Sequence, residues 1–97
     1  MVTLKEIELA HKRIRHLIHR TPILTNKSLN ELSGAKLYFK CENFQKVGAF
    51  KIRGATNTVE QLSQTEIEKG VATTSSGNHG AALSMAVTRR GGKTKVV

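Results

Sequence analysis

Residues 71–97, VATTSSGNHGAALSMAVTRRGGKTKVV, contain the pattern that decides the fold. Val71–Thr74 is a short run rich in β-branched residues and predicts a strand, and the polar loop Ser75–Gly80 follows it. Ala81–Val87 is apolar on nearly all sides, which predicts a buried helix, and Lys95–Val97 begins another strand. The order strand, loop, helix, strand predicts a parallel open sheet with helices on both faces, and therefore an α/β fold.

The N-terminal segment predicts an amphipathic helix over residues 3–18. Thr3 is a suitable N-cap, and Glu6, three residues on, completes a capping box. Apolar residues follow at helical spacing and form one stripe. The stripe comprises Leu4, Ile7, Ile14, Leu17 and Ile18.

The middle of the chain alternates between helix and strand signals. A short helix is expected to begin near residues 26–28 and to end at Gly34. Residues 36–41 alternate between apolar and polar side chains, which indicates a half-buried strand, with residues 42–48 as its exit loop. Beyond it, apolar residues recur at three- and four-residue steps, so a helix is expected to begin close to Lys51.

Composition is that of one small globular domain, with 97 residues, 38% of them apolar and 24% charged. The net charge of +9 favours anionic partners and leaves open a basic module that binds anions or nucleic acid. Only four residues are aromatic and the basic residues are scattered along the chain, so we expect a solvated basic surface and no nucleic-acid partner. The scattered basic residues include Lys12, Arg13, Arg15, Lys36, Lys40, Arg89, Arg90, Lys93 and Lys95.

The cysteine and histidine residues favour neither a disulfide nor a metal site. Cys41 is the single cysteine, so a reducing, cytoplasmic setting is expected, and no stretch resembles an export signal or a membrane span. His11 and His16 would lie about 140° apart around a helix, so we expect that they and His19 do not converge on a metal.

Lys51 is the first of two places where chemistry is expected. It lies where a predicted strand is followed by a predicted helix, and open parallel sheets bind ligands at the edge formed by such connections. The positive end of a helix dipole and partial desolvation both disfavour a protonated lysine, which suits an amine that attacks a carbonyl. The alternative is a surface lysine whose stem covers Phe50.

The loop Ser75–Gly80 is the second such place. Its glycines allow backbone amides to approach a ligand, and its hydroxyl and amide groups add donors at a helix start, which suits a carboxylate or phosphate. The alternative is a turn in which Ser76 or Asn78 caps the helix. No Gly-Lys-Ser/Thr ending is present, so a P-loop nucleotide site is not indicated.

Both places resemble a known family. Residues 40–55, KCENFQKVGAFKIRGA, resemble the lysine segment of fold-type II pyridoxal-phosphate enzymes, the serine racemase and serine/threonine dehydratase family. Residues 75–80, SSGNHG, resemble its substrate and cofactor loop, and Thr21–Leu24 resembles the segment that leads into the fold. The resemblance runs through most of the chain in the right order, and it implies a tryptophan synthase β-like architecture.

The resemblance also implies roles for individual residues. Lys51 would bear pyridoxal 5'-phosphate covalently and, once displaced by substrate, act as general base at Cα. Phe50 would pack against the cofactor ring, and Asn78 would hydrogen-bond its phenolic oxygen. The substrate carboxylate would be bound by Ser75, Ser76, Asn78 and His79.

Ser76 bears on the choice of reaction. Threonine dehydratases of the family often have alanine there, whereas racemase-like members have a serine that exchanges a proton on the face opposite the lysine. The implied function is therefore racemisation of serine, its dehydration to pyruvate and ammonia, or both. An L-threonine or 3-hydroxyaspartate ammonia-lyase is the alternative, and retention of Lys51, Asn78 and both serines argues against a non-catalytic relative.

Residues 1–97 are expected to be the N-terminal fragment of a catalytic domain, because a parallel sheet needs cover on both faces and the chain stops inside a new strand. The resemblance places the phosphate cradle and the sites for Mg²⁺ and ATP beyond residue 97, so the fragment alone is expected to be inactive. Ala81 departs from the glutamine common in racemases beside a nucleotide-contacting region. A homodimer is the expected full-length state, with a small amino-acid substrate and no membrane partner.

Overall fold

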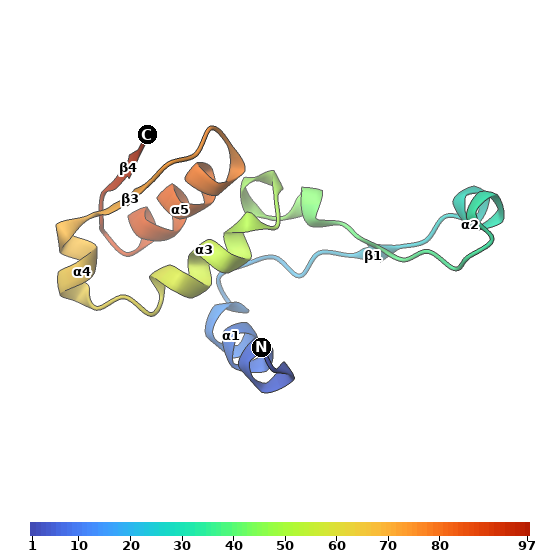
Figure 1. Cartoon of the computed structure of the whole chain (residues 1–97), viewed down its shortest axis with the longest axis horizontal. Helices are drawn as coiled ribbons and strands as arrows, with labels where there is room; N and C mark the ends of the chain where they lie inside the picture. The colour runs from blue at the N-terminus through green and yellow to red at the C-terminus, as the bar shows by residue number, and fades with distance from the viewer.

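The computed structural model describes residues 1–97 as short helices and strands in an elongated arrangement, 53 × 31 × 25 Å (Figure 1). A ribbon of two strands carries one helix at its tip and points away from a body that contains most of the other elements. In chain order the elements are α1 (Leu4–Ile14), β1 (Ile23–Leu24), α2 (Lys27–Ser33), β2 (Phe39–Lys40), the 3-10 helices η1 (Glu42–Phe44) and η2 (Lys46–Gly48), α3 (Lys51–Val59), α4 (Gln64–Lys69), β3 (Val71–Thr73), α5 (Asn78–Arg89) and β4 (Thr94–Val96).

The strand–loop–helix–strand unit predicted from residues 71–97 is confirmed. β3 and β4 pair in parallel, with Val71 opposite Thr94 and Thr73 opposite Val96, and α5 connects them. The return from α5 to β4 passes so close to α4 that a Cβ atom on Gly92 would lie 2.8 Å from side-chain atoms of Ile67 and Val87. The α/β class is therefore correct for this unit.

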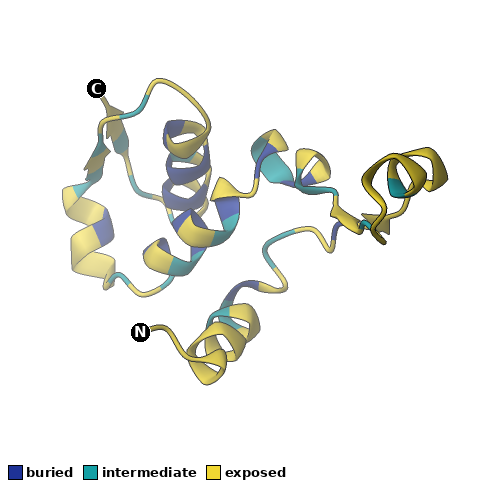
Figure 2. Cartoon of the chain, turned by 45° about the vertical axis from the view of Figure 1, so that its right-hand side comes forward, coloured by how far each residue is buried: buried dark blue, intermediate teal, exposed yellow.

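Helices α3 and α5 pack side by side and contain most of the core. Both begin at the same end of the pair and run in the same general direction (Figure 1). The buried residues form one stripe on each helix, facing the partner (Figure 2). One cluster joins Ile52 and Ala55 of α3 to Ala82 of α5, with Ile18 and Val47 packed against it. The second cluster comprises Val59, Ile67, Leu83, Ala86 and Val87.

The strand expected over residues 36–41 is shorter and more exposed than predicted. Only Phe39 and Lys40 are extended and paired, antiparallel to Leu24 and Ile23, and both are exposed. The alternating pattern correctly indicated extended backbone, but no second layer packs on this two-stranded ribbon, so neither face is buried. The antiparallel pairing of β1 with β2 was not predicted.

The predicted start of the N-terminal helix is confirmed, and its predicted end is wrong. Thr3 and Glu6 form the predicted capping box. The helix ends at Ile14, where the chain turns, so that Ile18 reaches the cluster around Ile52 instead of extending the stripe. Ile14 is the only buried residue of α1, and Leu4 and Ile7 are exposed.

The short helices illustrate local capping. α2 is confirmed, with Asn26 as side-chain N-cap and Gly34 in the left-handed region as C-cap. α4 was not predicted, although Ser63 and Glu66 form a capping box before it. None of the helices combines the length and the apolar character that a membrane span requires.

Candidate active site

Lys51 is the first residue of α3, and its amine is available for reaction. The side chain is exposed, and Nζ makes no hydrogen bond or ion pair within the chain. Nζ lies 5.2 Å from the centroid of the exposed Phe50 ring. This is a cation–π contact of Nζ itself, whereas the surface-lysine alternative expected the stem of Lys51 to cover Phe50.

The loop Ser75–Gly80 is closed by Ser75, and not by Ser76 or Asn78 as the capping alternative expected. The Ser75 Oγ accepts hydrogen bonds from the N–H groups of Gly77 (3.2 Å) and Gly80 (3.0 Å). The difference arises because Asn78 already lies inside α5, and Gly77, the residue before the helix, has no side chain. The N–H groups of Asn78 and His79 have no partner in the chain, so they remain available to an anion.

The two predicted places lie at the same end of the α3–α5 pair (Figure 1). Ile52, the residue after Lys51, is buried in one cluster with Ala82, which is in the second turn of α5. The structure thereby brings the start of α3 and the start of α5 together, but the strand before Lys51, β2, belongs to a separate antiparallel ribbon and not to the parallel sheet of β3 and β4. Of the predicted site residues, Ser75 is partly buried, and the others are exposed: Phe50, Lys51, Ser76, Asn78 and His79.

A network around Glu42 ties the loop before Lys51 to α3, and sequence reasoning missed it. Arg53 donates two hydrogen bonds to the Glu42 carboxylate, from Nε (2.8 Å) and from NH2 (2.7 Å). The hydroxyl of Thr21 donates to the same carboxylate at 2.6 Å, and Lys40 Nζ donates to the Thr21 carbonyl at 2.7 Å. The Arg53 hydrogen bonds, assisted by Thr21, lower the pKa of Glu42 to about 2.

Gln45 provides a second attachment of the same loop. The residue is 4% exposed, and its side chain pairs with the backbone of His19, accepting from the N–H group at 2.8 Å and donating to the carbonyl at 2.8 Å. Opposite charges at residues 42 and 53, on either side of Lys51, were a signal that could have suggested the first attachment. Nothing in the sequence indicated that Gln45 is buried.

Val47 lies within this loop in a conformation unusual for its residue type. Its φ is 58° and its ψ 13°, in the left-handed region, which a β-branched side chain rarely adopts. Gly48 follows with φ 69°. Such a backbone persists only where its surroundings hold it, and Val47 packs against the cluster around Ile52.

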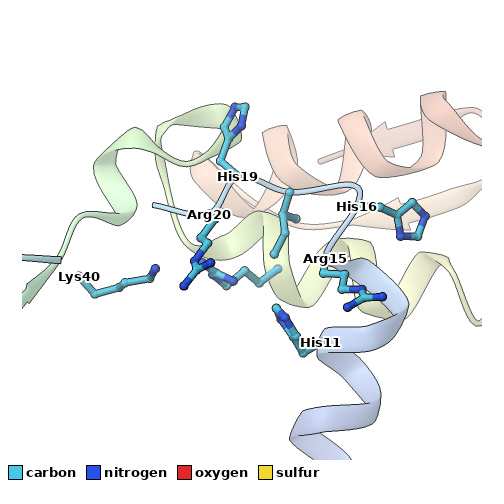
Figure 3. Close-up of a pocket in the computed structure, with 8 residues that line it drawn as sticks. His11, Arg15, His16, His19, Arg20 and Lys40 are labelled. Carbon is cyan, nitrogen blue, oxygen red and sulfur yellow. The ribbon is translucent and has the colours of Figure 1, made fainter. Parts of the chain in front are cut away.

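A basic hollow of about 820 Å³ lies between α1, the following turn and the base of the ribbon (Figure 3). The basic residues are scattered along the sequence, but the fold gathers several of them on this face. Seven of its eight lining residues are basic or imidazole side chains: His11, Arg15, His16, His19, Arg20, Lys40 and Arg53, with Ile18 as the eighth.

The three histidines line this hollow without forming a metal site. His16 lies beyond the end of α1, so the helical angle expected between it and His11 does not apply. The rings of His11, His16 and His19 lie apart (Figure 3). No group of three or more His, Cys, Asp or Glu side chains in residues 1–97 is arranged to hold a metal ion.

Known proteins resemble this chain in sequence and in structure. The chain is 62% identical over 85 residues to a serine racemase of Dictyostelium discoideum, which covers 88% of this chain and 26% of that protein. It is 56% identical over 95 residues to a beta-hydroxyaspartate dehydratase of Paracoccus denitrificans, and the aligned region covers 98% of this chain and 30% of that protein. The solved structure of maize serine racemase superposes with a TM-score of 0.90 at 46% identity, over 96% of this chain and 29% of that one.

This chain thus spans between a quarter and a third of the length of these relatives. The likeness in structure confirms the fold-type II architecture that the resemblance implied. The family model described as "Pyridoxal-phosphate dependent enzyme" matches residues 14–97, which include Lys51 and the loop Ser75–Gly80. The chain therefore belongs to the family of pyridoxal-phosphate dependent enzymes.

Proposed function

We propose that the protein carrying these residues is a pyridoxal-phosphate enzyme that racemises serine and dehydrates it to pyruvate and ammonia. One observation carries the proposal: the unpaired amine of Lys51 begins α3 beside the open first turn of α5. The similarity to serine racemases at both places supports the choice of substrate.

The residues present fit the cofactor. An aldehyde needs a primary amine without a hydrogen bond or ion pair, which Lys51 offers, and an aromatic ring needs an apolar surface, which the exposed Phe50 side chain would offer once Lys51 Nζ leaves its place over the ring. When bound, pyridoxal phosphate supplies an electron sink that stabilises negative charge at the substrate Cα. The exposed Asn78 amide would donate a hydrogen bond to the phenolic oxygen of the cofactor.

The remaining residues bind substrate and move protons. The free N–H groups at the start of α5, with the side chains of Ser76 and His79, would hold the substrate carboxylate. Ser75 would contribute by holding that turn in place. Lys51 would remove the Cα proton from one face of the substrate. Return of a proton from the Ser76 hydroxyl on the other face would complete racemisation. Loss of the β-hydroxyl in place of that proton return would lead to dehydration.

A β-elimination enzyme acting on L-threonine or 3-hydroxyaspartate is the alternative within the family. The similarity to a beta-hydroxyaspartate dehydratase supports it. It shares Lys51 and the α5 turn with the first proposal, and the two differ in the preferred side chain. Product analysis with L-serine, L-threonine and 3-hydroxyaspartate distinguishes them.

The proposal extends to the setting of the enzyme. Residues 1–97 would be the N-terminal part of a longer catalytic domain, in line with the span of the relatives. We propose a cytoplasmic homodimer, with Mg²⁺ and ATP bound by residues outside this chain. The free Cys41 supports a reducing compartment.

Borohydride trapping tests the central assignment. The intact protein is loaded with pyridoxal phosphate, its visible spectrum is taken before and after borohydride, and the reduced adduct is mapped by mass spectrometry. A pyridoxyl group on Lys51 supports the proposal. No adduct, or one on another lysine such as Lys46, contradicts it, and Lys51→Ala provides the matched control.

Anion binding is a second candidate function, favoured by the basic hollow. Several cationic groups facing one space attract phosphates or nucleic acid, and such binding weakens steeply with salt. The test titrates the intact protein with a labelled single-stranded oligonucleotide from low to high salt. The double variant Arg15→Gln/Arg20→Gln should abolish this binding, and the control Lys93→Gln/Lys95→Gln should retain it. Binding that is absent or independent of salt would exclude this function.

A further inference from the structure

Helix α3 begins without a side-chain cap. α1, α2 and α4 each start with a side chain that accepts a hydrogen bond from the first turn, from Thr3, Asn26 and Ser63 respectively. Phe50 precedes α3, offers no such acceptor and is itself in the right-handed helical region. Local capping therefore does not fix the position of Lys51.

The Glu42–Arg53 ion pair supplies the missing attachment. Arg53 lies two residues after Lys51, in the first turn of α3, and Glu42 lies nine residues before it, in η1. The pair is bidentate, with side chains 31% and 17% exposed, and so fixes the orientation of both groups as well as their distance. Lys51 thus lies in a segment, residues 42–53, whose two ends are joined by this ion pair.

Thr21 extends this attachment to the rest of the chain. The residue is 5% exposed; its hydroxyl donates to Glu42, and its carbonyl accepts from Lys40. The loop that is closed in this way contains Val47 in the left-handed region, a strained conformation that persists only where the surrounding structure holds it. Removing the pair frees that turn to relax and α3 to shift at its first residue.

We propose that Glu42, through Arg53, is a positioning residue for Lys51. The inference rests on the proposed function, since it concerns the presentation of the Lys51 amine to a carbonyl. A misplaced amine reacts more slowly even where binding is unchanged, because the rate of attack depends on alignment. Glu42 contacts no reacting atom, and its effect is transmitted by the bidentate hydrogen bonds.

The test compares two isosteric variants in the intact protein. Glu42→Gln removes one acceptor oxygen and the negative charge from the ion pair with Arg53. Glu60→Gln does the same to the Glu60–Arg89 pair, which has similar exposure (23% and 33%) but lies at the opposite end of α3. A general loss of rigidity would follow from both substitutions, whereas loss of positioning follows only from the first.

Four quantities are measured for each variant: the rate at which pyridoxal phosphate becomes attached to Lys51, the pH profile of that rate, and kcat and KM for product formation. We expect Glu42→Gln to lower the attachment rate and kcat about tenfold, with KM within about twofold and the pH profile displaced. Glu60→Gln should match the parent. Arg53→Gln, alone and with Glu42→Gln, should show that the two losses do not add.

The outcomes separate the two proposals. If the parent protein forms no adduct on Lys51, the proposed function fails. If the adduct forms on Lys51 in the parent, but Glu42→Gln retains its attachment rate and pH profile, or Glu60→Gln loses as much, the positioning role is overturned. Should Glu42→Gln not fold, Thr21→Val removes only the third hydrogen bond. Thr21→Val must then also lower the attachment rate, and an unchanged rate overturns the positioning role.

Discussion

The Oγ atom of Ser75 lies 3.0 Å from the backbone nitrogen of Gly80 and accepts its hydrogen bond. Gly80 is buried, and a Cβ atom on it would lie 3.0 Å from Cγ1 of Val96 and 3.4 Å from Cβ of Ser75. The serine side chain, the first turn of α5 and strand β4 therefore pack without room for an extra methyl group. Ser75 acts on the site mainly through this turn, as the acceptor that holds it.

Replacing Ser75 by alanine should destabilise the protein by about 1 kcal/mol, the usual effect of losing a side-chain cap. Two N–H groups at the start of α5 would lose their acceptor. Urea unfolding of the intact protein measures the change. Ser76→Ala is the matched control, because Ser76 is exposed and makes no such bonds, and equal stability of Ser75→Ala and the parent would contradict the capping role.

Replacing Ser76 by alanine should divide the two reactions. If its hydroxyl exchanges the proton opposite Lys51, racemisation of serine falls by about 10²-fold or more, the usual contribution of a general acid–base group. Elimination needs only the Lys51 face and should be retained within a few-fold. Chiral analysis of serine and a keto-acid assay on the same samples measure both. Parallel loss of both reactions would show that Ser76 acts on substrate binding instead.

Glu42 should make stability depend on pH in acid. Its pKa in the folded chain is about 2, below the ordinary value of 4.5, so the folded state favours the ionised form. That contribution is complete above about pH 4.5 and is lost as the pH falls toward 2. At pH 7 we expect Glu42→Gln to lower the free energy of unfolding by roughly 1–2 kcal/mol, allowing for partial exposure.

Urea unfolding at pH 7, 5 and 3.5 tests this expectation. The difference between Glu42→Gln and the parent should shrink at the lowest pH. Glu31→Gln is the control, since Glu31 forms only an exposed pair with Lys27 at 3.9 Å, and it should change stability little at any of these pH values. A difference for Glu42→Gln that is constant with pH would contradict the assigned pKa.

Gly92 should not tolerate a side chain. A Cβ atom there would lie 2.8 Å from side-chain atoms of Ile67 and Val87, and 3.0 Å from the carbonyl oxygen of Ile67. Both neighbours are fully buried, so Gly92→Ala should cost about 1–3 kcal/mol through overpacking. The adjacent Lys93→Ala, on an exposed side chain, serves as control. Thermal unfolding that leaves both variants alike would show that α4 and α5 can separate at low cost.

Much of the fold follows from local signals. The capping box at Thr3 and Glu6, the cap pair Asn26 and Gly34, and the parallel unit around α5 all depend on short-range chemistry that can be read directly. Lys51 at the start of α3 was also predictable, because the apolar spacing changes at that residue. α4 carried a readable capping box at Ser63, which was not used.

The parts that were mispredicted depend on long-range contacts. Residues 15–18 leave the helix so that Ile18 can join the core, a choice that helical spacing cannot reveal. Burial of the strand around Phe39 was overestimated because alternation does not show whether another layer is present. The network of Glu42, Arg53 and Thr21 joins segments up to 32 residues apart in sequence and depends on the path of the intervening loops.

The residues of the proposed site and the residues that hold them differ in burial, and this difference bears on which positions can be varied. The residues assigned to cofactor and substrate are exposed on this chain: Phe50, Lys51, Ser76, Asn78 and His79. Those that hold them are buried: Thr21, Gln45, Ile52 and Ala82. Substitutions at exposed positions usually change folding stability little. A mutagenesis library for new activity should therefore vary the residues of the first set other than Lys51, whose amine both proposed reactions need, and leave the second set unchanged.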